Sequence, residues 1–278
     1  MAYSFADAPK PRLAAPPGAT DTHMHIYEPG YAMASTAIIP PQDGPLADYK
    51  QLQARLGLSR VVVVQPSTYG LDNTCTLEAV AKVGANARAV ICATDDTTDK
   101  ELEALHKQGA RGIRFFMMPG GPVTWDMMDG LAARARLLDW HIQLQLDGRT
   151  LPDYMAQLDV ISELLVIDHV GRFMEPVSID SRGFKALLRL VDGGAYVKLS
   201  GPYESTKSGA PWSDIGVLAK ELVRRAPDRM VWATNWPHPM QVPRPDDAPL
   251  LDMLLDWVPD EATRTKILVD NPARLYGF

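Results

Sequence analysis

Short apolar segments alternate with amphipathic segments along this chain of 278 residues, and the alternation repeats eight times without a break in composition. We predict strands at residues 19–26, 61–65, 89–93, 111–116, 141–146, 164–169, 195–200 and 230–234. We predict helices at residues 45–56, 73–83, 99–108, 125–138, 151–158, 180–191, 212–226, 250–257 and 260–269. Residues 61–65, for example, form a β-branched run without polar alternation, which is typical of a parallel strand buried on both faces.

This alternation predicts an α/β protein, a single (β/α)8 TIM barrel over residues 18–278. Barrels of this kind commonly have about 250 residues. A doubly wound open sheet is the alternative, but no Gly-rich phosphate loop follows the first predicted strand. We expect residues 1–17 to form an extended arm on the barrel surface, because prolines exclude a helix there: Pro9, Pro11, Pro16 and Pro17.

The composition excludes several classes of partner. The net charge is −6, with acidic and basic residues interspersed, whereas nucleic-acid binding needs a clustered basic face. The first residues lack the apolar core of a signal peptide, and no apolar segment reaches the ~18 residues that span a bilayer. We therefore expect a cytoplasmic protein that binds neither nucleic acid nor membrane. The sequence leaves the oligomeric state open, and we predict that Cys75 and Cys92 are buried thiols.

The active site of a (β/α)8 barrel lies at the carboxyl ends of its strands, so the polar residues there are candidate site residues. In chain order these are His23, His25, Gln65, Ser67, Tyr69, Arg111, Arg114, Gln145, Asp147, His169, Arg172, Lys198, Ser200, Tyr203, Asn235 and His238.

Three histidines stand out in this set. His23 and His25 are two residues apart, which puts both imidazoles on one face of the first strand. Such a pair can reach one cation or one substrate oxygen, although two satisfied polar side chains are the alternative. His169 ends the sixth predicted strand. Three histidines at strand ends favour a functional interpretation over a structural one.

Two arginines are candidates for binding an anion. Arg114 lies within the fourth strand and is expected to point inward, and Arg172 follows the sixth strand. A guanidinium inside a barrel is costly unless an anion pairs with it, and its planar fork suits a carboxylate. We expect both to bind a substrate carboxylate, with structural salt bridges as the alternative. Lys198 is expected to bind a substrate carboxylate, to form a structural salt bridge, or to neutralise Asp147.

The eighth strand ends unusually. Its apolar run stops at Asn235 and then turns at the two prolines of Trp236-Pro237-His238-Pro239. Many hydrolases place an aspartate at this strand end to take a proton from water. An asparagine amide cannot act as a base, although an exchange of an original aspartate at this position is also compatible with the sequence.

Three segments together resemble the amidohydrolase superfamily, in the amidohydrolase 2 branch that contains 2-pyrone-4,6-dicarboxylate lactonase. They are Thr20-Asp21-Thr22-His23-Met24-His25, Val166-Ile167-Asp168-His169-Val170-Gly171-Arg172, and Trp236-Pro237-His238-Pro239. The resemblance implies that His23, His25 and His169 polarise a lactone carbonyl without a divalent metal. It also implies that Arg114 and Arg172, helped by Ser67, hold carboxylates.

The sequence departs from that branch in three places. Asn235 replaces the acidic residue, Gln145 replaces an expected tyrosine, and residues 201–204 lack an arginine. A flat pyrone dicarboxylate is therefore not the expected substrate. The resemblance, together with Asn235, implies an isomerase that moves the acyl group within a small carboxylated sugar lactone. We expect Asn235 to hold a reacting oxygen, and Gln145, Tyr203 and His238 to be further substrate-binding residues.

Two other functions remain open at this point. One is a lactone hydrolase in which a metal-bound hydroxide attacks, since zinc needs about three protein ligands and the histidines supply that number. Without the acidic residue or a bridging lysine that metal site is incomplete, so we expect no cofactor and no metal. The other is a sugar-acid binder without catalytic activity.

Overall fold

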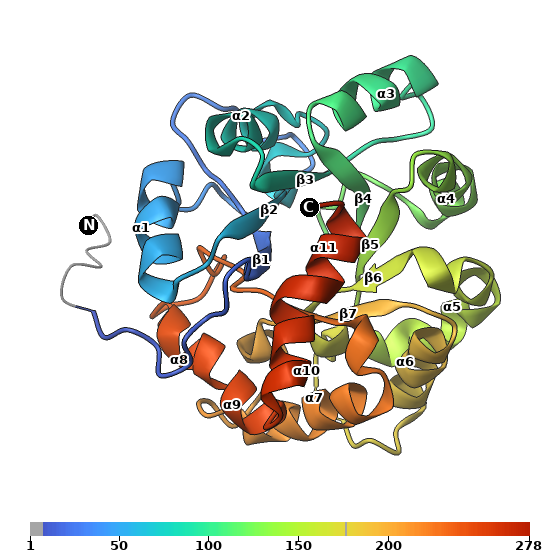
Figure 1. The fold of residues 1–278 in the computed structure, drawn as a ribbon. Helices are drawn as coiled ribbons and strands as arrows, with labels where there is room; N and C mark the ends of the chain where they lie inside the picture. Colours follow the sequence, from blue (N-terminus) through green and yellow to red (C-terminus); the bar gives the residue numbers. More distant parts are fainter. Residues whose placement is uncertain (1–7, 176) are drawn as a thin grey trace.

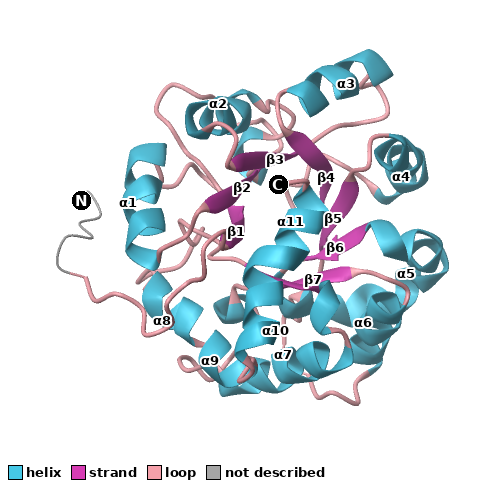
Figure 2. Cartoon of the chain, viewed as in Figure 1, coloured by secondary structure: helices cyan, strands magenta, loops and turns pink. Residues whose placement is uncertain are grey.

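Eight parallel strands form one sheet in the order β1 to β8 in the computed structural model, which describes residues 8–175 and 177–278 (Figure 1, Figure 2). The strands are β1 (Thr20–Met24), β2 (Arg60–Val64), β3 (Ala87–Ile91), β4 (Ala110–Phe116), β5 (His141–Gln145), β6 (Leu165–Ile167), β7 (Tyr196–Leu199) and β8 (Met230–Trp232). Each pairs in parallel with the next along the chain. The predicted (β/α)8 barrel is confirmed.

The helices between the strands form a ring around the sheet (Figure 1). They are α1 (Leu46–Leu56), α2 (Thr74–Val83), α3 (Asp99–Lys107), α4 (Met128–Leu137), α5 (Leu151–Leu158), α6 (Arg182–Asp192) and α7 (Ser213–Arg225). After β8 come α8 (Asp247–Asp252), α9 (Leu254–Trp257), α10 (Glu261–Thr265), a π-helical turn (Lys266–Asp270) and α11 (Asn271–Tyr276). Arg88, near the start of β3, donates to the carbonyl of Tyr276, so α11 lies at the amino end of the barrel.

The sequence analysis ended the last helix at residue 269, before Asn271-Pro272, and this is wrong. The helical path continues through Pro272 to Tyr276. Pro272 follows the π-helical turn Lys266–Asp270 closely, so the hydrogen-bond pattern of the helical path changes just before the proline. A proline in the sequence therefore does not by itself show that a helix ends there.

The strands are buried on both faces, as their β-branched runs predict. In β2, Val61 and Val63 belong to the large core between the sheet and the surrounding helices. Val62 and Val64 point the other way and pack with Tyr276. Both cysteines are buried and free, as expected.

Asp21 connects β1, the first strand of the barrel, to the segment that follows β8, the last strand. Its carboxylate accepts a hydrogen bond from the backbone N–H of Thr234 (3.0 Å) and another from the hydroxyl of Thr234 (2.6 Å). The hydroxyl of Tyr49 donates to the same carboxylate (3.0 Å). The backbone N–H of Asn235 in turn donates to the carbonyl of His23 (2.8 Å). These bonds fix the chain after β8 against β1, so His23 and Asn235 are held side by side.

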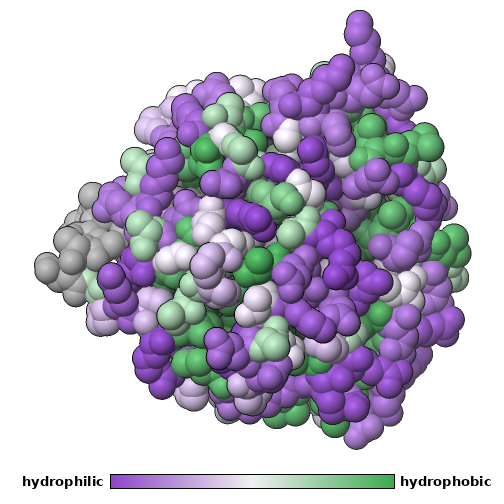
Figure 3. All heavy atoms as spheres, in the orientation of Figure 1, coloured by the Kyte–Doolittle hydropathy of each residue, from purple (hydrophilic) through white to green (hydrophobic). Residues whose placement is uncertain are grey.

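Residues 8–17 follow the barrel surface without regular secondary structure. The Arg55 side chain in α1 donates to the carbonyl of Pro9 (2.9 Å), and the Leu13 N–H donates to Asp252 in α8 (2.8 Å). The part of the predicted arm at residues 1–7 lies outside the described residues. Among the described residues, no helix has the length and apolar character to cross a bilayer. Hydrophilic and hydrophobic residues are interspersed on the face drawn in Figure 3.

We expect Thr234→Val to lower the free energy of unfolding by about 1–3 kcal/mol, because the buried Asp21 carboxylate would lose its shortest hydrogen bond. Urea denaturation measures this change. Thr36→Val makes the same exchange at an exposed position and is expected to have almost no effect. Equal stability of the two variants would contradict the importance of the Asp21–Thr234 contact.

Candidate active site

A cavity of ≈ 260 Å³ opens at the carboxyl ends of the strands. Seven of the ten residues predicted to catalyse or to bind substrate line it: His25, Ser67, Arg114, Gln145, His169, Arg172 and Asn235. The other three of these ten residues lie behind the cavity wall. His23 is fully buried beneath His25, and Tyr203 and His238 lie behind Asn235.

The hydrogen bonds of His25 determine which of its nitrogens carries the proton. Nδ1 is 2.8 Å from the carbonyl oxygen of Val64, which can only accept, so Nδ1 donates. Burial lowers the pKa of His25 to about 3, and the ring is therefore neutral at neutral pH. A neutral ring with its proton on Nδ1 has a bare Nε2. His25 thus offers a proton acceptor.

His23 completes this chain of hydrogen bonds. Its Nε2 is 3.2 Å from Nε2 of His25, so one of the two nitrogens must donate. Since His25 Nε2 is bare, the proton lies on His23 Nε2. The other nitrogen of His23, Nδ1, then accepts from the ammonium of Lys198 at 3.2 Å or from the amide of Gln143 at 3.3 Å. A proton on Nδ1 instead would leave two bare nitrogens facing each other.

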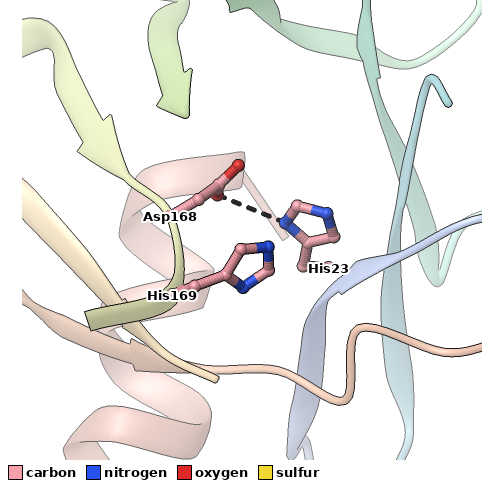
Figure 4. A group of neighbouring side chains, drawn as sticks. All are labelled: His23, Asp168 and His169. Atoms are coloured by element: carbon pink, nitrogen blue, oxygen red, sulfur yellow. Dashed lines mark hydrogen bonds and ion pairs between the residues drawn. The ribbon is translucent and has the colours of Figure 1, made fainter. Parts of the chain in front are cut away.

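A buried charge pair supports His23 from below. The Lys198 ammonium lies 3.5 Å from the Asp168 carboxylate and 2.6 Å from the amide oxygen of Gln143. The same carboxylate lies 3.2 Å from Nδ1 of His23, and His169 extends from the neighbouring position (Figure 4). The sequence-based option that Lys198 neutralises Asp147 is wrong. Lys198 points into the barrel, whereas Asp147 pairs with Arg149 at the surface.

These surroundings keep the buried histidines neutral. Burial is the main cause that lowers the pKa of His23 well below its usual value, and the neighbouring Lys198 ammonium lowers it further. Burial lowers the pKa of Lys198 itself to about 8, so this amine remains mostly protonated at neutral pH. The fixed positive charge therefore opposes a second positive charge on His23.

His23, Asp168 and His169 bring their potential ligand atoms within 4.8 Å of one another, as a metal site would. The cluster does not fit a divalent cation well, because the Lys198 ammonium already lies against both His23 and Asp168. A cation bound there would meet a like charge in a buried environment, where such repulsion is strong. Asn235 also provides no carboxylate.

His169 is presented to the cavity by an unusual stretch of backbone. His169, Val170 and Arg172 all have positive φ angles (54°, 55° and 44°). Nδ1 of His169 lies 2.9 Å from the Ser200 hydroxyl, which leaves Nε2 for a ligand. A side chain at Gly201 would bring Cβ to 2.9 Å from that imidazole, so the ring position requires glycine there.

Arg114 is a buried cation without an anionic partner among the described residues. Its guanidinium donates to the carbonyl of Gln65 (2.6 Å) and to the amide oxygen of Gln145 (2.8 Å), both of which are neutral. Nε is buried and has no hydrogen-bond partner in the described part of the chain. Since a buried charge is costly unless it is paired, this arrangement suits a ligand carboxylate in the cavity.

Arg172 differs from Arg114 because the protein already neutralises it. Its Nε and one terminal nitrogen donate to the same Glu204 carboxylate oxygen, at 3.1 and 2.9 Å. Both side chains are 13% exposed, and both residues line the cavity. The prediction that Arg172 binds a substrate carboxylate therefore has less structural support than the same prediction for Arg114.

The amide of Asn235 is oriented from behind. Nδ2 of Asn235 donates to the hydroxyl of Tyr203 (3.1 Å), and that hydroxyl lies 2.7 Å from Nδ1 of His238. Burial raises the pKa of Tyr203 well above its usual value, so its hydroxyl keeps its proton and donates to His238. Nε2 of His238 lies 3.0 Å from Asp247. Because Nδ2 of Asn235 is used by Tyr203, Oδ1 of Asn235 remains as a hydrogen-bond acceptor for a ligand.

The sequence analysis did not assign four residues that take part in this site: Gln143, Asp168, Glu204 and Asp247. Polar residues within apolar strand runs were the available signal for Gln143, and Asp168 directly precedes His169. The contacts of Glu204 and Asp247 depend on how loops fold over the barrel, for which the sequence holds no comparable signal.

The fold and the site define a (β/α)8-barrel enzyme scaffold with histidines, arginines and an amide around one cavity. The model of the Amidohydrolase family matches residues 20–278, and this chain belongs to that family.

Relatives in this family include proteins that act on lactones. The chain is 39% identical to a D-galactarolactone isomerase of Agrobacterium fabrum, over 96% of this chain and 93% of the relative. It is 34% identical to a 4-sulfomuconolactone hydrolase of Hydrogenophaga intermedia, over 96% and 91%. An apo crystal structure of an Agrobacterium tumefaciens protein has a TM-score of 0.91 and 38% identity, over 96% of this chain and 98% of that one.

We expect Lys198→Met to raise the pKa of His23, because the ammonium that opposes its protonation is removed while Asp168 remains. The pH at which the ring takes up a proton would move upward. NMR of protein with 15N-labelled histidine measures this titration. Lys220→Met, which removes a half-exposed lysine, serves as the control. An unchanged His23 titration in Lys198→Met would contradict the proposed network.

Proposed function

We propose that this enzyme is an isomerase that converts D-galactaro-1,5-lactone into D-galactaro-1,4-lactone. The observation that carries the proposal is the amide of Asn235 just after β8, at the position where a hydrolase needs a base to activate water. The likeness to a D-galactarolactone isomerase supports the same choice. Such a step belongs to the breakdown of galacturonate and galactarate, and we expect it to take place in the cytoplasm.

The free carboxylate of the lactone is assigned to Arg114, whose buried guanidinium has no anionic partner among the described residues. Gln145 keeps the guanidinium in place, and the nearby Ser67 hydroxyl adds a hydrogen bond to the ligand. The lactone carbonyl then points toward the histidines. Arg172, which is paired with Glu204, offers its remaining N–H groups to the substrate hydroxyls.

In the reaction, the C4 hydroxyl attacks the C1 carbonyl and the bond between C1 and O5 breaks. Intramolecular attack is fast when the chain is held in a ring-forming shape, and no water needs to be activated. Oδ1 of Asn235 orients the attacking hydroxyl. As the hydroxyl attacks, its proton passes from the hydrogen bond with Oδ1 of Asn235 to Nε2 of His25, which gives up its hydrogen bond from His23. Nε2 then returns the proton to O5. The proton therefore passes between two oxygens of one substrate.

The oxyanion that forms at C1 needs a hydrogen-bond donor. His169 supplies it when the Ser200 hydroxyl donates to Nδ1 and the proton stays on Nε2. The sequence analysis gave this role to all three histidines. The hydrogen bonds revise that expectation, because His25 uses its only N–H on Val64 and His23 lies beneath it. His23 acts by holding His25.

Hydrolysis of a small carboxylated lactone is the alternative function, since relatives of that class are also similar to this chain. Glu204 is the carboxylate in the cavity wall that could serve as its base. Two hydrogen bonds from Arg172 already occupy its oxygen Oε2, so only the other carboxylate oxygen is available for this role.

Proton NMR of D-galactaro-1,5-lactone mixed with the protein tests the proposed function. We expect the signals of the 1,4-lactone to replace those of the 1,5-lactone, without accumulation of open-chain galactarate. Dialysis against EDTA beforehand is expected to leave the rate unchanged, because no metal takes part. Open-chain acid as the first product would support the hydrolase instead, and loss of activity that zinc restores would contradict the absence of a metal.

We expect Asn235→Asp to form open-chain galactarate in the same assay and to lose at least about tenfold in isomerisation rate, because a carboxylate at this position can activate water. Asn86→Asp makes the same exchange at an exposed residue before β3 and controls for the added charge. Unchanged isomerisation with no open-chain product would rule out the role assigned to Asn235.

A further inference from the structure

We propose that Glu204 restricts the cavity to lactones with one negative charge. The inference rests on the proposed function, because it concerns the charge of the lactone that the same cavity binds. It starts from the two arginines in the cavity wall, which differ in their partners. Arg114 has no anion among its described partners, whereas Arg172 is bound to Glu204 through two hydrogen bonds.

The contacts of Glu204 explain how this selection works. Its carboxylate oxygen Oε2 lies 2.9 Å and 3.1 Å from two nitrogens of Arg172. Both side chains are only 13% exposed, so little water is present to screen their charges. A second ligand carboxylate that approached Arg172 would have to displace Glu204 or lie beside its negative charge. Like charges in such a partly buried place repel each other.

After Arg172 has paired with Glu204, the positive charge of Arg114 remains available to a ligand. Arg114 can bind one carboxylate, and Arg172 with Glu204 presents a neutral pair of hydrogen-bonding groups. A lactone with one carboxylate and several hydroxyls matches both features. A lactone with two acidic groups matches only the first.

Binding of two matched probes tests this inference without relying on turnover. The probes are 2-pyrone-6-carboxylate and 2-pyrone-4,6-dicarboxylate, which differ by one carboxylate, and calorimetry gives their affinities. We expect the unmodified protein to bind the monocarboxylate at least as tightly as the dicarboxylate. In Glu204→Gln, the affinity for the dicarboxylate relative to the monocarboxylate should rise by at least about tenfold, because Arg172 gains a free charge.

Two further variants control this measurement. Glu175→Gln removes one negative charge from an exposed residue paired with Lys207, and should keep the original preference. The double variant Arg172→Gln/Glu204→Gln removes both members of the pair and should also keep it. If Glu204→Gln is not folded, the preference of the unmodified protein still decides the matter.

Three results would overturn the inference: a clear preference of the unmodified protein for the dicarboxylate, an unchanged preference in folded Glu204→Gln, or an equal gain in Glu175→Gln. A loss of isomerisation by Glu204→Gln without a change in preference would show that Glu204 acts as a base instead. The expected preferences in a protein without isomerase activity would contradict the proposed function alone.

Discussion

The contact between the Asp21 carboxylate and Thr234 determines where the reactive groups of this barrel lie. Burial raises the pKa of Asp21 to about 6, and the hydrogen bonds from Thr234 and Tyr49 oppose this rise by stabilising the charged form. Because these bonds fix the chain after β8 against β1, Asn235 lies beside the strand that carries His23 and His25. The relative position of amide and imidazoles is thus a consequence of how the barrel closes.

The charges beneath and around the cavity are consistent with transfer of a proton within one substrate. Lys198 lies under His23, and the positive charge of Arg114 also lowers the pKa of His25. Neutral imidazoles accept and return protons, whereas permanently charged ones only donate. The same arrangement works against a divalent cation, since a buried ammonium already lies against His23 and Asp168. The cavity thus combines a neutral proton acceptor with a cation, Arg114, that has no anionic partner in the described part of the chain.

The sequence predicted the barrel well because each buried strand is an apolar run between helices, and it predicted which residues would lie near strand ends. Strand spacing gives the face on which a side chain lies, but not its partner across the barrel. This is why the sequence analysis offered Asp147 as one partner of Lys198. In the structure, Lys198 contacts His23 and Asp168 instead. Nor could it show that Tyr203 lies behind Asn235, because a loop makes that contact.

Reaction in water enriched in 18O tests most directly whether the substrate's own hydroxyl attacks the lactone. If the C4 hydroxyl attacks, the 1,4-lactone formed contains no oxygen from the solvent, and mass spectrometry shows an unchanged mass. Hydrolysis followed by reclosure would place 18O in the carboxyl group of the open acid and leave part of it in the new lactone. Label in the 1,4-lactone formed during a single turnover would contradict intramolecular attack.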